Sequence, residues 1–227
     1  MRKFYKMSMG IATAGLLVVG MSACSMSSNE SSDDTSSSAA PTAEADPVPL
    51  ASIPALSGVD TAVTLDQGFA DALESLGLTA GVTGDATLED GTLHFPITGG
   101  NVDYYDPAED YRPYVQGEID HEGSGITLTA GDTEVELSDF VIDPGTSRLT
   151  GTVTANGEKV ADDVYIFNLD GSTLKPLAED SDGNAVLEGT RVLVSPDAAT
   201  LLNETFGTDA VTDTLLVGIA KITAAAE

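Results

Sequence analysis

The sequence predicts a mainly β fold, an antiparallel sandwich or barrel-like domain with two short helices. Short segments rich in β-branched and aromatic residues follow one another between residues 92 and 222. Turn sequences such as AGDT, DPGTS, ANGE and LDGS separate many of them, and two segments stand out for their helix caps and apolar spacing. Closely spaced strands joined by tight turns pair antiparallel, and this is the basis of the predicted fold class.

Two helices are predicted from their caps. The first begins at Thr64, with Gln67 in the capping-box position, and it ends at Gly77. Its apolar residues share one helical face, and they are Leu65, Phe69, Ala72, Leu73 and Leu76. The second is SPDAATLLNETFG at residues 195–207, which has a serine cap, a proline in the first helical position and a final glycine.

The other elements are predicted to be strands. In chain order they are TLHFPI, YVQGEIDH, GITLTA, EVELSDFVI, RLTGTV, DVYIFNL, TRVLV and LLVGIAKI. The first of them alternates apolar and polar residues, as a half-buried strand does, and Pro96 places it at an edge or a bulge. In the second, Val115, Gly117, Ile119 and His121 share one face, so His121 is expected to point toward the apolar side.

The first 48 residues have the pattern of an exported lipoprotein. Residues 1–23 combine a basic start, an apolar run too short to span a bilayer and small residues, the layout of a secretory signal peptide. The sequence MSAC resembles a bacterial lipobox, in which Cys24, the only cysteine, becomes lipidated. An ordinary cleaved signal with an incidental cysteine is the alternative. Residues 24–48, rich in Ser, Ala and acids, are predicted to be a disordered linker, and residues 49–227 the folded domain.

These features predict a protein held by a lipid on the extracytoplasmic face of the cell membrane. The formal net charge is −28, and removal of residues 1–23 leaves six basic and 37 acidic residues, a formal charge of −31. A surface of this charge repels nucleic acid and anionic lipid head groups, so we expect neither as a partner. The membrane is therefore expected as a partner through the lipid alone.

One long segment resembles a known family. The run GTLHFPITGGNVD, followed by GEIDHEGSGITLTAGDTEVELSDFVIDPGTSRLTGTV, is similar to the HtaA-domain family of Gram-positive surface proteins. The similarity extends over about residues 63–223, including the helix around Phe69 and the segment GTRVLVSPDAATLLNETFGT. It implies a β-rich surface domain, which binds haem in some members of the family.

The resemblance implies the fold and not the haem site. The family's iron-ligating tyrosine lies on the first helix, a few residues after the phenylalanine. In this chain Phe69 is followed by Ala70, Asp71, Ala72 and Leu73, and the chain has no tryptophan to begin that helix. The family's supporting histidine aligns with Asp120 or Ser124, so His121 is one residue out of register.

A cluster of aromatic residues is the candidate ligand site. Residues 92–123 contain four of the six tyrosines and both histidines. The candidate ligand-binding residues are Tyr104, Tyr105, Tyr111, Arg112, Tyr114 and His121. A tyrosinate can ligate haem iron when a neighbouring hydrogen-bond donor stabilises it, and His121 could serve. The alternative, which we favour, is an edge hairpin with aromatic cross-strand pairs and a hydrogen-bonded histidine.

Metal sites and catalysis are not expected. His94 has no second histidine at a zinc-binding spacing. The acidic segments EDSDGNAVLEG and YYDPAEDY offer oxygen ligands for calcium, but turn chemistry accounts for both, so calcium is not expected. Ser124 lies near His121 in sequence without the elbow motif of a hydrolase, and no phosphate-binding glycine loop or cysteine nucleophile is present.

The sequence thus predicts a non-enzymatic cell-surface binding or envelope module with no required cofactor. A haem-binding or haem-uptake lipoprotein that uses the tyrosine cluster and His121 is one alternative. A structural or adhesive protein that binds cell-wall or surface components is the other.

Overall fold

The computed structural model describes residues 47–226. The predicted signal peptide, the lipidation site at Cys24 and all but the last two residues of the predicted linker lie outside the described residues. Within the described part, no helix is long and apolar enough to cross a membrane.

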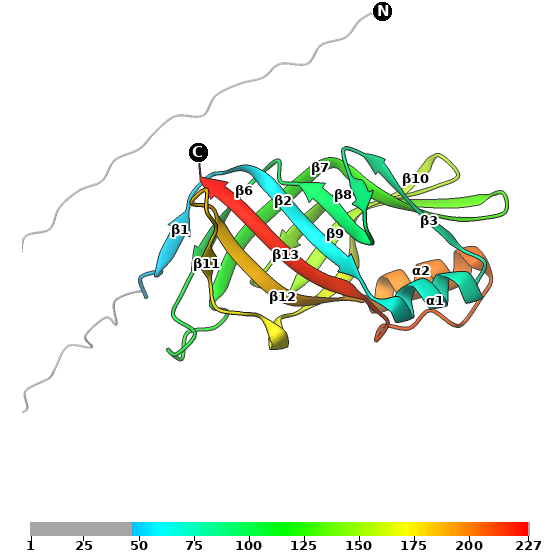
Figure 1. Cartoon of the computed structure of the whole chain (residues 1–227). Helices are drawn as coiled ribbons and strands as arrows, with labels where there is room; N and C mark the ends of the chain where they lie inside the picture. The colour runs from blue at the N-terminus through cyan, green and yellow to red at the C-terminus, as the bar shows by residue number, and fades with distance from the viewer. Residues whose placement is uncertain (1–46, 227) are drawn as a thin grey trace, which may run out of the picture. The chain divides into compact units, whose positions relative to one another are not determined.

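Antiparallel strands make up most of the described residues (Figure 1). In chain order the elements are β1 (Ala51–Ile53), β2 (Leu56–Leu65), α1 (Gln67–Ser75), β3 (Thr79–Gly84), β4 (Thr87–Glu89), β5 (Thr92–Pro96), β6 (Gly99–Tyr104), β7 (Val115–Ala130), β8 (Thr133–Asp143), β9 (Arg148–Ala155), β10 (Glu158–Asp170), the 3₁₀ helix η1 (Gly171–Thr173), β11 (Ala178–Glu179), β12 (Ala185–Val194), α2 (Pro196–Phe206) and β13 (Leu216–Ala226).

The strands form one sheet in the order β1-β6-β7-β8-β9-β10-β12-β13-β2-β5-β4. Two short strands lie beside this path, with β3 paired to β7 and β11 paired to β12. Every pairing is antiparallel. The mainly β, antiparallel fold class with two short helices is therefore confirmed.

The link between β5 and β6 connects the two end regions of the sheet. Strand β5 pairs with β2, whereas β6 pairs with β7. Between them, the Ile97 amide donates to the Val59 carbonyl of β2 at 3.2 Å, and the Thr98 amide donates to the Asp120 carbonyl of β7 at 2.8 Å. Pro96 is the last residue of β5, where its missing amide hydrogen does not interrupt this crossing.

The core lies on the inner face of the coiled sheet. Among its most buried side chains are Leu128, Val135, Leu137, Phe140, Ile142, Val153 and Ile166. The ring of Phe140 contacts those of Phe95 and Phe167, with centroid separations of 5.4 and 6.3 Å. Burial of each large apolar side chain contributes about 1.5–3 kcal/mol to folding, so this inner face supplies much of the driving force.

Facing bulges in β7 and β8 decide which residues point inward. The register shifts between His121 and Gly125 on β7, and between Ser138 and Val141 on β8. Before the β8 bulge Val135 and Leu137 are buried, and after it Phe140 and Ile142 are buried instead. The bulges are joined by the Gly123 amide, which donates to Asp139 Oδ1 at 3.0 Å. The predicted strands YVQGEIDH, apart from Tyr114, and GITLTA are thus parts of one strand, β7.

The two helices lie at one end of the sheet, away from β1, β6 and β11 (Figure 1). Helix α2 has the predicted caps, since Ser195 Oγ accepts the Ala198 amide and Gly207 adopts a left-handed conformation. The predicted cap of the first helix at Thr64 is wrong. Thr64 remains in β2, paired with β13 and β5, and Asp66 caps α1 by accepting the Gly68 amide. Because of this sheet pairing, β2 continues through the residues predicted to form the first turn of the helix.

Candidate ligand-binding cavity

A cavity of about 440 Å³ opens at the end of the sheet opposite the helices. The end of β6, the beginning of β7 and the end of β8 form one wall, and β10, β12 and β13 form the other. Strand β1 and the segment from η1 to β11 border it. Side chains that line it are mainly apolar, among them Ile53, Val102, Ile142, Leu169, Leu187 and Ile222.

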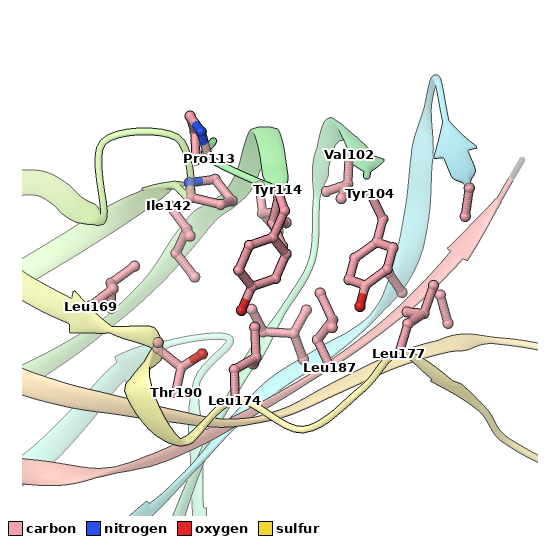
Figure 2. A pocket seen from close by; sticks show the side chains of 18 of the residues that line it. Val102, Tyr104, Pro113, Tyr114, Ile142, Leu169, Leu174, Leu177, Leu187 and Thr190 are labelled. Atoms are coloured by element: carbon pink, nitrogen blue, oxygen red, sulfur yellow. The ribbon is translucent and has the colours of Figure 1, made fainter. Parts of the chain in front are cut away.

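Two tyrosines supply polar groups to this apolar surface. Tyr104, at the end of β6, and Tyr114, just before β7, pack edge to face with ring centroids 6.0 Å apart. Figure 2 shows both hydroxyl groups directed toward Leu174, Leu177 and Leu187 on the opposite wall. Within the described residues, neither hydroxyl has a hydrogen-bond partner. A ligand could therefore accept or donate hydrogen bonds at two places.

Within residues 47–226, Arg112 is the only charged residue that lines the cavity. Its guanidinium is fixed by the loop that carries it. Nη1 donates to the carbonyls of Glu109 and Tyr111 at 2.6 and 2.8 Å, and Nη2 donates to the carbonyl of Pro107 at 2.9 Å. The guanidinium carbon lies 5.5 Å from the centre of the Tyr114 ring, within cation–π range.

The structure divides the predicted cluster into three groups: the residues that line the cavity, a separate tyrosine pair, and His121. Tyr104, Arg112 and Tyr114 line the cavity. Tyr105 and Tyr111 do not line it, and their rings instead pack against each other with centroids 4.6 Å apart. This pair and the Tyr104–Tyr114 pair are the kind of aromatic contact expected of an edge hairpin.

His121 lies apart from the cavity, in the interior of the domain. It points inward as the strand pattern predicts, and its exposed fraction is 1%. Its Nε2 lies 2.8 Å from Thr61 Oγ1 and its Nδ1 lies 3.3 Å from the Phe140 carbonyl. A carbonyl only accepts, so the Nδ1 hydrogen donates to Phe140 and Nε2 accepts from Thr61. Burial lowers the pKa of His121 to about 4, so the ring is neutral.

The tyrosines and His121 therefore do not form one site. His121 borders a second, inner cavity of about 40 Å³. Among the described residues, only Ile142 lines both cavities. His121 does not line the larger cavity, so it could not contact an iron that Tyr104 or Tyr114 ligated there. The combination of a tyrosine ligand with a supporting His121 is not assembled in this conformation.

The remaining polar candidates have structural partners. His94 Nδ1 lies 2.5 Å from Asp60 Oδ2. In EDSDGN, both oxygens of Asp180 accept hydrogen bonds from the turn, and the bonds from Asn184 lower the pKa of this carboxyl. In YYDPAEDY, Asp106 accepts the Ala108 amide. No group of three or more metal-binding side chains occurs within residues 47–226.

Ser124 and His121 do not form a catalytic pair. No hydrogen bond joins them, because both ring nitrogens of His121 bond to other groups. Ser124 is fully buried, and within the described residues its hydroxyl has no hydrogen-bond partner.

Sequence reasoning does not identify the opposite wall of the cavity. Leu174 and Leu177 come from the segment between β10 and β12, and Leu187 comes from β12, all far along the chain from the tyrosines. One signal was present, since Leu174 and Leu177 are apolar residues in a stretch that is otherwise polar or turn-forming, GSTLKPLAEDSDGN. Apolar residues in such a loop indicate that the loop packs against another part of the protein, but they do not identify that part.

The comparisons with known proteins identify the class of fold. No protein-family model matches the chain, and no curated protein matches it significantly. The crystal structure of the C-terminal domain of HtaA from Corynebacterium glutamicum is similar, with a TM-score of 0.51 and 15% identity over 75% of this chain and 97% of that one. A domain-swapped dimer of a histidine-to-alanine variant of that domain has a TM-score of 0.44 and 16% identity, over 69% and 90% of the two chains.

The described part of this chain therefore has a β-rich fold like that of the C-terminal domain of HtaA. The fold implied by the sequence resemblance is confirmed at low sequence identity. More particularly, the chain has an HtaA-like β domain without a tyrosine on α1, whose sequence is QGFADALES.

Proposed function

We propose that this protein is a non-enzymatic binding protein that holds an apolar small molecule in the cavity at the open end of its sheet. The observation that supports this proposal is the cavity itself. Its volume of about 440 Å³ lies within the range of about 300–1,000 Å³ found for small-molecule sites. Such sites are mostly apolar with a few directed polar groups, and here those groups are the hydroxyls of Tyr104 and Tyr114.

The setting of this site is part of the proposal. We infer that Cys24 is lipidated and that the domain acts on the extracytoplasmic face of the membrane. The Cys24→Ser variant should then move from the membrane fraction to the medium. Membrane retention of that variant would contradict lipid anchoring, and it would leave the binding proposal unaffected.

Binding is tested with a neutral fluorescent probe, N-phenylnaphthylamine, whose emission rises in an apolar site. The full chain with Cys24→Ser is used, so that an attached acyl group cannot compete. We expect saturable binding to one site. Ala185→Trp introduces an indole into the cavity from β12 and should abolish that binding. Val160→Trp, on an exposed position of β10, is the matched control and should bind normally.

The outcome of this test is clear in either direction. Circular dichroism first establishes that both tryptophan variants are folded. Loss of probe binding in the Ala185 variant alone supports the cavity. Equal binding by the wild type and both variants would place the probe elsewhere and contradict the proposal.

Haem is a second candidate, because two tyrosine hydroxyls point into an apolar cavity and tyrosine is a known ligand of haem iron. Haemin is therefore titrated and the absorption spectrum recorded. A saturable Soret shift that is lost in Tyr104→Phe or Tyr114→Phe would support iron ligation. A spectrum unchanged by both substitutions would contradict it. His121→Gln should have no effect on the spectrum, since His121 does not line the cavity.

A further inference from the structure

Arg112 is one of three basic residues within residues 47–226 that form no ion pair with a carboxylate, the others being Arg148 and Lys221. The sequence has 37 acidic and nine basic residues, and six of the basic residues lie within residues 47–226. Lys159, Lys175 and Arg191 form ion pairs at 2.6–2.7 Å with Asp162, Glu188 and Asp170. Within residues 47–226 no carboxylate pairs with Arg112, although it borders an apolar cavity. Its charge is therefore available to a ligand.

The guanidinium also retains hydrogen-bond donors. Of its five N–H groups, three donate to the carbonyls of Pro107, Glu109 and Tyr111. The Nε hydrogen and one Nη2 hydrogen are not used within the described residues. The loop carbonyls hold the plane of the guanidinium in place without neutralising it, so the Arg112 side chain would lose little conformational entropy when a ligand binds.

We propose that the cavity takes an amphiphile with an apolar body and a terminal carboxylate, and that Arg112 binds the carboxylate. The inference rests on the proposed function, since it assigns the ligand class of the same cavity. The apolar body would lie between the tyrosines and the leucines of the opposite wall, near Leu174 and Leu187. A charge-assisted hydrogen bond from a positioned guanidinium is among the stronger polar contacts available to a ligand.

Two kinds of molecule share this chemistry, a long-chain fatty acid and a porphyrin with propionate groups. Both place an acidic group at the end of an apolar body. A porphyrin without iron separates carboxylate recognition from iron ligation. Protoporphyrin that binds as tightly as haemin would indicate that the carboxylate and the apolar body suffice.

The test compares cis-parinaric acid with its methyl ester at a pH of about 8, where the acid is ionised. Both are fluorescent in an apolar site, and they differ in charge and in one methyl group. We expect the full chain with Cys24→Ser to bind the acid about tenfold or more tighter than the ester. Arg112→Gln should remove this preference by weakening the acid alone.

Two further variants separate charge from loop structure. Arg112→Lys keeps the positive charge without the three-carbonyl clamp, and it should keep part of the preference for the acid. Arg148→Gln removes a cation that lies over the Tyr165 ring and does not line the cavity, so it should change nothing. A loss in Arg148→Gln equal to that in Arg112→Gln would show a general charge effect and overturn the assignment.

The results distinguish the inference from the function on which it rests. An ester that binds as tightly as the acid leaves an apolar binding cavity and overturns the role of Arg112. Equal weakening of acid and ester in Arg112→Gln also overturns it, because the residue would then act only through the loop. If neither compound binds, and the neutral probe fails as well, the proposed function itself is wrong.

Discussion

At the scale of single residues, His121 illustrates how burial replaces a possible ligand role with a structural one. Alternation along the strand predicts that it points inward. Its partners cannot be predicted in this way, because Thr61 and Phe140 are 60 and 19 residues distant in sequence. Only the coiling of β2 against β7 and the two facing bulges bring these groups together.

The buried His121 makes stability depend on pH. The unfolded chain has a histidine pKa of about 6.5 and gains a proton below it, whereas the folded chain keeps His121 neutral down to about 4. The unfolded state therefore binds more protons in this window, and the free energy of unfolding falls as the pH falls. When the pH falls from about 7.5 to about 5, His121 should lower the free energy of unfolding by about 2 kcal/mol.

Urea denaturation at both pH values measures this effect, with His121→Gln as the comparison. Glutamine offers a donor and an acceptor but does not titrate, so the variant should lose less stability between the two pH values. The comparison also removes the contribution of the acidic surface, which both proteins share. The same pH dependence in both proteins would contradict the account.

At the scale of elements, local sequence signals are most reliable where no neighbouring strand competes. Helix α2 has its predicted serine cap and its glycine stop, and it follows the end of β12 directly. The first helix begins later than its capping-box signal suggests, because β2 pairs through Thr64 on both sides. The bulge at Asp139 similarly changes which residues of β8 face inward, and period-two alternation alone does not predict it.

The β6–β7 pair that supports the tyrosines depends on two glycines with positive φ. Gly100 and Gly117 have φ values of 109° and 120°, and an added Cβ would lie 2.0 Å from the Glu118 and Asn101 carbonyl oxygens respectively. Each clash is with backbone of the facing strand, so it cannot be relieved by a side-chain rotation. The close approach of β6 to β7 at this point requires glycine on both strands.

Gly117→Ala should therefore lower the free energy of unfolding by about 2–4 kcal/mol, through backbone strain and the clash together. Gly131→Ala is a suitable control, since Gly131 has a φ of 58° and open space around the added Cβ. That substitution should cost only about 1 kcal/mol from the backbone conformation. Equal losses of unfolding free energy in the two variants, measured by urea denaturation, would show that β6 and β7 move apart enough to relieve the clash, and this would contradict the account.

At the scale of the whole domain, the sequence is sufficient for the fold class and insufficient for the site. Strand-forming segments, turns and the family resemblance together predict an HtaA-like β domain. The cavity needs the sheet order, because its walls come from β6 and β7 on one side and from β10, β12 and β13 on the other. Three of the six candidate residues line it, and the opposite wall has no sequence signal that links it to them.

The most direct test of the central claim is a methyl NMR titration of the full chain, carrying Cys24→Ser, with N-phenylnaphthylamine. The account predicts that the methyl signals of Leu174, Leu187 and Ile222, which line the cavity, shift as the probe binds. The methyl signals of Val135 and Ile166, which are buried in the core, should stay in place. Shifts confined to the core or to residues elsewhere, with the cavity methyl groups unchanged, would contradict a ligand-binding cavity at the open end of the sheet.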